Sequence, residues 1–168
     1  PPLIAAVEPA EAFIREDAGV TLPAPLLVRL TNAWTSDVAV DVTSSSPANL
    51  LVGDGGLVIV PTGSLTAPIP LTGVLQGDAG VTATLGTSSR SAAVRVLGLF
   101  EPSSLESLAP IAANLAPGGK VTFTARLDVP PISAEVVSIS LSPAGFGTAP
   151  ATVTIPADQL EVSFDVLA

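Results

Sequence analysis

The sequence contains no histidine and no cysteine among its 168 residues. Their absence excludes Ser-His-Asp and Cys-His catalysis and the usual zinc and copper sites, and no disulfide can stabilise the fold. Tyrosine is also absent and Trp34 is the single tryptophan, so a carbohydrate platform of stacked aromatic rings is not expected. Methionine is absent even at position 1, which suggests a processed or excerpted piece.

Charged residues are scarce as well, at 12% of the chain against about 25% in typical proteins. The net charge is −9 and the pI ≈ 4.1, which argues against nucleic acid and anionic membrane surfaces as partners, because both need Lys and Arg. Residues 57–77 carry no charge, but their prolines and glycines argue against a membrane helix. A surface poor in charge tolerates burial against neighbours, so we expect a homo-oligomer or polymer, with other surface proteins as further candidate partners. A GC-rich genome would explain the same composition.

A period-two pattern runs from Val153 to Val166. Apolar and polar residues alternate, a Pro-Ala-Asp turn interrupts them, and the alternation resumes, which predicts strand, turn, strand. Elsewhere, 17 prolines and 14 glycines separate short apolar runs, a pattern typical of an all-β sandwich or barrel. Residues 11–17 and 103–113 are the two stretches that could form short helices.

The pattern around Val153 has an earlier, looser copy. Residues 58–71 align with residues 153–166 at a separation of 95, and Val7-Glu8-Pro9 matches Phe100-Glu101-Pro102 at a separation of 93. We therefore predict two tandem β-sandwiches, residues 1–97 and 98–168. In the first, residues 81–85 and 92–96 should form a hairpin across 86–90, and residues 53–56 and 76–80 should form turns.

The second copy is shorter than the first. Ala168 aligns with Gly73, whereas the first copy continues to about Leu97 with two more predicted strands. A sandwich without its final strands leaves core residues and sheet edges uncovered. Three explanations stay open: the sequence given ends before its domain does, a neighbouring subunit supplies the missing strand as in donor-strand fibres, or the strands pair differently within this chain.

Several stretches of the second copy carry a family resemblance. Pro-Gly-Gly-Lys-Val-Thr-Phe-Thr-Ala-Arg-Leu at 117–127 resembles the opening strands of bacterial Ig-like repeats. Ser-Pro-Ala at 142–144, Val-Thr-Ile-Pro-Ala at 153–157 and Val-Ser-Phe-Asp-Val at 162–166 resemble their middle, and Calx-β-like modules share part of this pattern. The resemblance implies two tandem Ig-like β-sandwiches of an extracellular bacterial protein, used as a spacer, adhesive module or structural subunit. It carries over no catalytic residue.

Few residues remain that could carry chemistry. Two acidic pairs could serve glycoside hydrolysis, and two glycine-rich turns could hold calcium, although the acid spacing of known calcium loops is absent. These residues are Glu16 with Asp17, Glu161 with Asp165, and Asp54 and Asp78 in the turns. Each is better explained as a solvated surface or turn residue, as is Lys120, the only lysine. We therefore predict no enzyme, no metal site and no cofactor.

Trp34, in the predicted loop of residues 32–37, is the single candidate ligand contact; the alternative is a partly buried lid on the end of a sandwich. We expect an extracellular or cell-surface structural module of a bacterial surface protein or fibre, acting by self-assembly and by strand complementation between subunits. A ligand-binding adhesin module that uses loops at a sandwich end is one alternative. A non-catalytic accessory domain of a secreted enzyme is the other.

Overall fold

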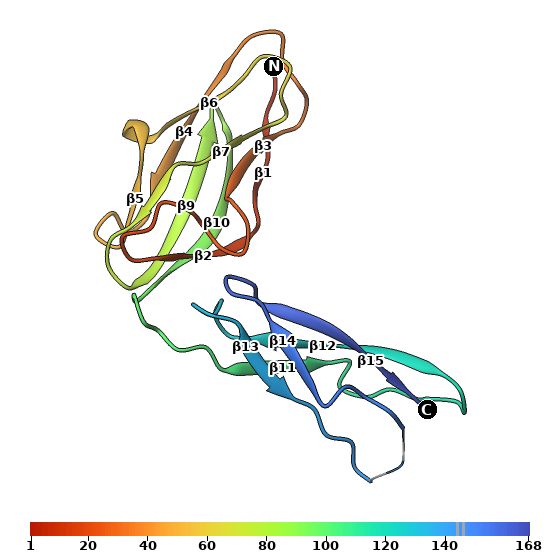
Figure 1. Cartoon of the computed structure of the whole chain (residues 1–168). Helices are drawn as coiled ribbons and strands as arrows, with labels where there is room; N and C mark the ends of the chain where they lie inside the picture. Colours follow the sequence, from red (N-terminus) through yellow and green to blue (C-terminus); the bar gives the residue numbers. More distant parts are fainter. Residues whose placement is uncertain (144, 146) are drawn as a thin grey trace. The chain divides into compact units, whose positions relative to one another are not determined.

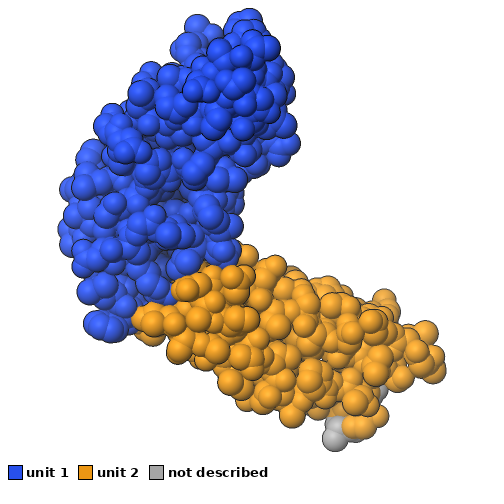
Figure 2. Space-filling view, turned by 45° about the horizontal axis from the view of Figure 1, so that its top comes forward, with its two compact units in different colours: residues 1–101 blue, residues 102–168 orange. Residues whose placement is uncertain are grey.

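The structure is a computed structural model that describes all residues except 144 and 146. The chain folds into two compact units, Pro1–Glu101 (unit 1) and Pro102–Ala168 (unit 2) (Figure 2). The described residues form fifteen strands and one short 3-10 helix, η1 (Asp54–Gly56), so the predicted all-β fold class is confirmed. No helix among them is long and apolar enough to cross a membrane. The division into folding domains after residue 97 stays a prediction.

Unit 1 is a sandwich of two main sheets with a small third one (Figure 1). The smaller main sheet has the order β1 (Ile4–Glu8), β3 (Leu27–Leu30), β7 (Thr66–Pro68). The larger has the order β2 (Glu11–Arg15), β10 (Ser88–Leu97), β9 (Gly77–Leu85), β4 (Val38–Ser44), β6 (Leu57–Val60). The third pairs β5 (Leu50–Val52) with β8 (Leu71–Gly73). All pairs are antiparallel except β2 with β10.

Alternating residues from both main sheets form the core of unit 1. Along β4, every second residue is buried, because successive side chains of a strand point to opposite faces. The same alternation holds on β3, β9 and β10, whereas the irregularity in β1 separates its two buried residues, Ile4 and Val7, by three positions. Together these strands form one continuous cluster, which includes Ile4, Val7, Val28, Leu30, Val40, Val42, Val81, Ala83, Val94 and Val96. The periodicity of the sequence therefore reports which face of each strand is covered.

The predicted hairpin is confirmed, with a tighter connection than expected. In the β9–β10 pair, Leu85 lies opposite Ser88, so the loop is Gly86-Thr87 rather than residues 86–90. The turn predicted over residues 76–80 is wrong, because β9 already begins at Gly77. The Gly80 amide donates a hydrogen bond to the Ser45 hydroxyl (2.8 Å). A Cβ atom on Gly77 would clash with the Asn49 side chain, so glycine at the start of β9 permits a close approach to a neighbouring loop rather than a turn.

Both short helices considered from the sequence are wrong. Residues 11–15 form β2, which buries Ala12 and Ile14 and runs parallel to β10. Residues 105–109 form β11, an exposed strand of unit 2. Pairing with strands far away in the sequence overrides the weak local preference in each case.

Unit 2 has two small sheets (Figure 1). The first has the order β11 (Leu105–Ala109), β12 (Lys120–Leu127), β15 (Glu161–Leu167), and the second pairs β13 (Glu135–Ser138) with β14 (Thr152–Ile155). The core contains Ala125, Phe164 and Val166, with the Phe123 and Phe164 rings stacked at 6.0 Å between centroids. The last residue of the Ser-Pro-Ala match, Ala144, lies outside the described residues.

The two units share one pairing plan. β1–β3–β7 in unit 1 matches β11–β12–β15 in unit 2, and β4–β6 matches β13–β14. The predicted separation of 95 residues is confirmed for β6 with β14 and for β7 with β15, while β3 and β4 match β12 and β13 at a separation of 97. β1 matches β11 at a separation of 101, and both strands have an irregularity at the same position of the register. The predicted match at a separation of 93 is therefore wrong.

The final strands of the two units differ, as the sequence predicts. β9 and β10 of unit 1 have no counterpart among the described residues of unit 2. This difference decides which faces and edges of unit 2 are uncovered.

Candidate functional site

In the part of the chain that the structure describes, no group of three or more acidic side chains could hold a metal ion. On β15, Asp165 accepts hydrogen bonds from the Lys120 ammonium (3.0 Å) and the Thr122 hydroxyl (2.6 Å). The hydrogen bond from Thr122, followed by that from Lys120, lowers the pKa of Asp165. Glu161 instead forms an ion pair with Arg126 at 3.6 Å. The two carboxylates thus bind different cations across the exposed face of the sheet.

The remaining acidic candidates also occupy separate places. Glu16 accepts a hydrogen bond from the Gln76 amide (2.8 Å), which joins the end of β2 to the segment before β9. Asp54 lies in η1, whereas Asp78 is on β9 opposite Arg95 and not in a turn. Such positions suit surface and turn residues better than ligands of a shared ion.

Trp34 lies in the loop between β3 and β4, where 37% of its surface is exposed. Its carbonyl accepts a hydrogen bond from the Gly63 amide (2.8 Å). Three residues later, Asp37 accepts hydrogen bonds from the Thr62 amide (2.8 Å) and hydroxyl (2.9 Å), and these bonds lower the pKa of Asp37. Two loops at one end of unit 1 are therefore tied together beside Trp34.

A hollow of about 570 Å³ lies against this loop. Its walls come from the N-terminal residues, the Trp34 loop and the β9–β10 turn, and include Pro2, Leu3, Trp34, Asp37, Leu85 and Thr87. Of these residues, only Asp37 is charged. The hollow thus combines one aromatic ring, apolar walls and one carboxylate, a combination that suits a small, partly apolar ligand.

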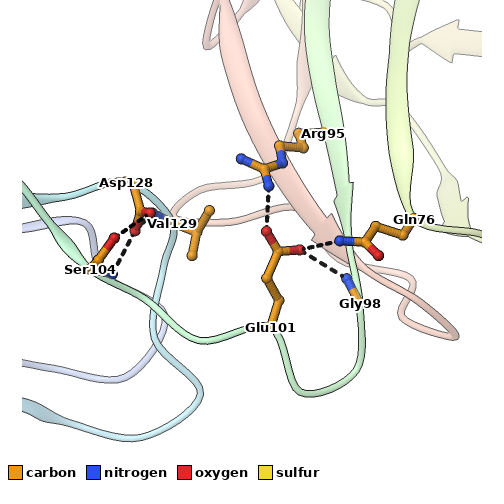
Figure 3. Close-up of polar contacts among 7 residues, drawn as sticks. All are labelled: Gln76, Arg95, Gly98, Glu101, Ser104, Asp128 and Val129. Carbon is orange, nitrogen blue, oxygen red and sulfur yellow. Dashed lines mark hydrogen bonds and ion pairs between the residues drawn. The ribbon is translucent and has the colours of Figure 1, made fainter.

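Two carboxylates that the sequence analysis did not identify, those of Glu101 and Asp128, each hold a loop in place by several hydrogen bonds. Within unit 1, Glu101 forms an ion pair with Arg95 and accepts hydrogen bonds from the Gln76 side chain (3.0 Å) and the Gly98 amide (3.2 Å) (Figure 3). The Glu101 side chain is 14% exposed, so it is the better shielded partner of the pair. It fixes the segment that follows β10.

The second carboxylate, Asp128, acts in the same way within unit 2. It accepts hydrogen bonds from the Ser104 amide and hydroxyl (both 2.7 Å) and from the Val129 amide (2.8 Å) (Figure 3). Partial burial, the largest single influence, raises the pKa of Asp128, but the hydrogen bonds from Ser104 and Val129 together lower it below its usual value. No local motif in the sequence marks either carboxylate, because their partners are set by the fold.

Unit 2 contains an apolar groove of about 160 Å³ between its two sheets. Its walls contain no charged residue and include Leu108, Leu115, Phe123, Ile139, Leu141 and Phe164. Residues 139–141, which directly follow β13, line one side of the groove. Apolar walls of this kind are normally covered by another element of the fold.

No known protein family matches the sequence, and no curated protein is similar to it. Solved structures similar in shape include domains 5–6 of the S-layer protein SbsC (15% identity, TM-score 0.43, covering 100% of this chain and 86% of that one). The D0-D1 domain of intimin is another (15%, 0.44, 97% and 84%), and the calcium-binding domain CBD12 of CALX1.1 a third (10%, 0.33, 96% and 74%). Because all three TM-scores are below 0.5, these similarities do not indicate the function of this chain, which has to be argued from its own residues.

Proposed function

We propose that this chain is a structural module of an extracellular bacterial surface protein or fibre, and that it acts by associating with further copies of itself. The observation that carries this proposal is the combination of a low surface charge with unpaired sheet edges. Within the described residues, β6 pairs only with β4, β11 only with β12, and β14 only with β13.

Unpaired edges matter because they present rows of backbone amides and carbonyls to any approaching strand. Proteins usually block such edges with lysines, prolines or bulges. β6 and β14 contain no charged residue and no proline. Edge pairing, or a strand of one copy completing an open sheet of another, would join copies through backbone hydrogen bonds, and the scarcity of charge reduces electrostatic repulsion between them.

The test is the mass of the chain in solution, measured by sedimentation velocity between about 1 and 100 μM. Association through β6 predicts a mass that rises with concentration and falls when Ile59→Lys places a charge on that edge. Because Ile59 is exposed, the substitution leaves the core unchanged. Ala93→Lys is a matched control, because Ala93 is also exposed but lies on β10, which is paired on both sides. A monomer at every concentration would contradict the proposal.

A ligand-binding adhesin module is the second candidate, favoured by the hollow beside Trp34. Quenching of Trp34 fluorescence by small peptides and glycans, with Trp34→Ala as the control, tests it. A saturable signal that disappears in Trp34→Ala would support binding at this end. An accessory role beside a secreted enzyme has no specific observation in its favour.

A further inference from the structure

The pairing plan shared by the two units identifies an unfilled position next to β13. In unit 1, β4 lies between β6 and β9. In unit 2, β13 corresponds to β4 and β14 to β6, but no described strand lies on the other side of β13. The position of β9 is therefore empty in unit 2.

The backbone directions agree with this comparison. The Ile139 amide donates a hydrogen bond to the Ala151 carbonyl (2.9 Å), on the β14 side. Because successive amides along a strand point to opposite sides, those of Ser138 and Ser140 point to the open side. Their counterparts, Asp41 and Thr43, lie opposite residues of β9.

The exposure of side chains on β11, in the other sheet of unit 2, also indicates that a covering strand is missing. Ile4 of β1 is 1% exposed, whereas its counterpart Leu105 of β11 is 56% exposed. Val7 is 4% exposed and its counterpart Leu108 is 44% exposed. In unit 1 these positions lie beneath β10, and the Ile4 amide donates a hydrogen bond to the Ser88 hydroxyl of that strand (3.1 Å).

The groove of unit 2 occupies the corresponding place. Residues 139–141 contribute to its wall, and they correspond to residues 42–44, which pair with β9 in unit 1. We propose that this edge and groove form a docking site for a β-hairpin built like β9–β10, with small apolar residues on the face that enters the groove. In unit 1 the β9–β10 hairpin fills the corresponding position, so the shared plan gives the chemistry of the occupant.

The chemistry of the hairpin follows from the one that unit 1 already contains. Every second residue of β9 and β10 faces the core, and these residues are small and apolar. They are Ala79, Val81 and Ala83 on β9, and Ala92, Val94 and Val96 on β10. Small side chains suit a narrow, uncharged groove. A second copy of this chain is a poor donor, because its own β9 and β10 are paired on both sides within a five-stranded sheet. The docking site does not depend on the association proposed above.

The test extends the full chain by a second copy of residues 74–97 after Ala168, and measures amide hydrogen exchange by NMR. The expected result is exchange at Ser138 and Ser140 slowed by at least about tenfold. The Ile139 amide, which already has its partner, serves as the internal reference. The matched control carries Val81→Asp and Val94→Asp in the added copy alone, and should leave both serine amides exchanging fast.

Two results would overturn the proposal. In the first, the serine amides of the extended chain exchange as fast as before, while the amides between β12 and β15 remain protected. In the second, these amides become protected in the unextended chain as its concentration rises, which would make a second copy the occupant. Neither result bears on the proposed self-association of the chain, which the sedimentation measurement tests separately.

Discussion

Truncating two equivalent residues, one in each unit, should have very different effects on stability. Ile4 is fully buried in the core of unit 1, and its counterpart Leu105 is more than half exposed in unit 2. Ile4→Ala should destabilise unit 1 by about 2–5 kcal/mol, because a buried aliphatic side chain is replaced by a cavity. Leu105→Ala should cost about 1 kcal/mol or less, since most of that side chain is not removed from water.

Urea unfolding measures both effects. Trp34 is in unit 1, so its fluorescence follows that unit, and hydrogen exchange in the β12–β15 pair follows unit 2. With a urea dependence of about 1–3 kcal/mol per M, Ile4→Ala should lower the midpoint by about 1–2 M. A shift below about 0.3 M would refute the burial of β1, and equal losses in the two variants would refute an open face on unit 2. In the chain extended by the hairpin, the cost of Leu105→Ala should rise.

Three further changes test local contacts. Glu101→Gln removes the ion pair with Arg95 but keeps an acceptor, so unit 1 should lose about 1 kcal/mol or less in the same urea titration. NMR titration should give Asp128 a pKa below the ordinary carboxyl value, and Ser104→Ala should raise it. Because the folded pKa is lowered, the stability that Asp128 contributes is present above the ordinary value and is lost as the pH falls through the lowered one. Gly73→Ala places a methyl group against the β2 backbone and should destabilise unit 1 by about 1–3 kcal/mol.

Each of these predictions has an outcome that would contradict it. A loss well above 1 kcal/mol in Glu101→Gln would mean that the carboxylate is more deeply enclosed than its contacts indicate. An Asp128 pKa that Ser104→Ala leaves unchanged would exclude the Ser104 hydroxyl as a cause of the lowered pKa. A fully stable Gly73→Ala chain would show that β8 and β2 lie further apart.

Alternation of side chains predicts much of this fold because one face of most strands is buried. It correctly places β4, β15 and the β9–β10 hairpin, and it reveals the repeat that joins β6 to β14. It fails at β2, whose five residues are too few to show a period, and whose parallel partner lies about 80 residues away. The segment from Gly77 to Gly80 also misleads, since glycine signals both a turn and a close approach.

The candidate sites follow the sequence less closely. Trp34 stands out as the only tryptophan, but the hollow beside it depends on residues from three separate segments. The contacts of Glu101 and Asp128 depend on loop geometry that no motif encodes. In contrast, the uncovered edge of unit 2 follows from counting strands in the two copies, which a sequence repeat makes possible.

Amide-by-amide hydrogen exchange of the unextended chain, at a concentration where it is monomeric, tests the central claim most directly. The account predicts slow exchange at Asp41 and Thr43, which β9 covers, and fast exchange at their counterparts Ser138 and Ser140. Equally slow exchange at all four amides would contradict it, because β13 would then already be paired on both sides.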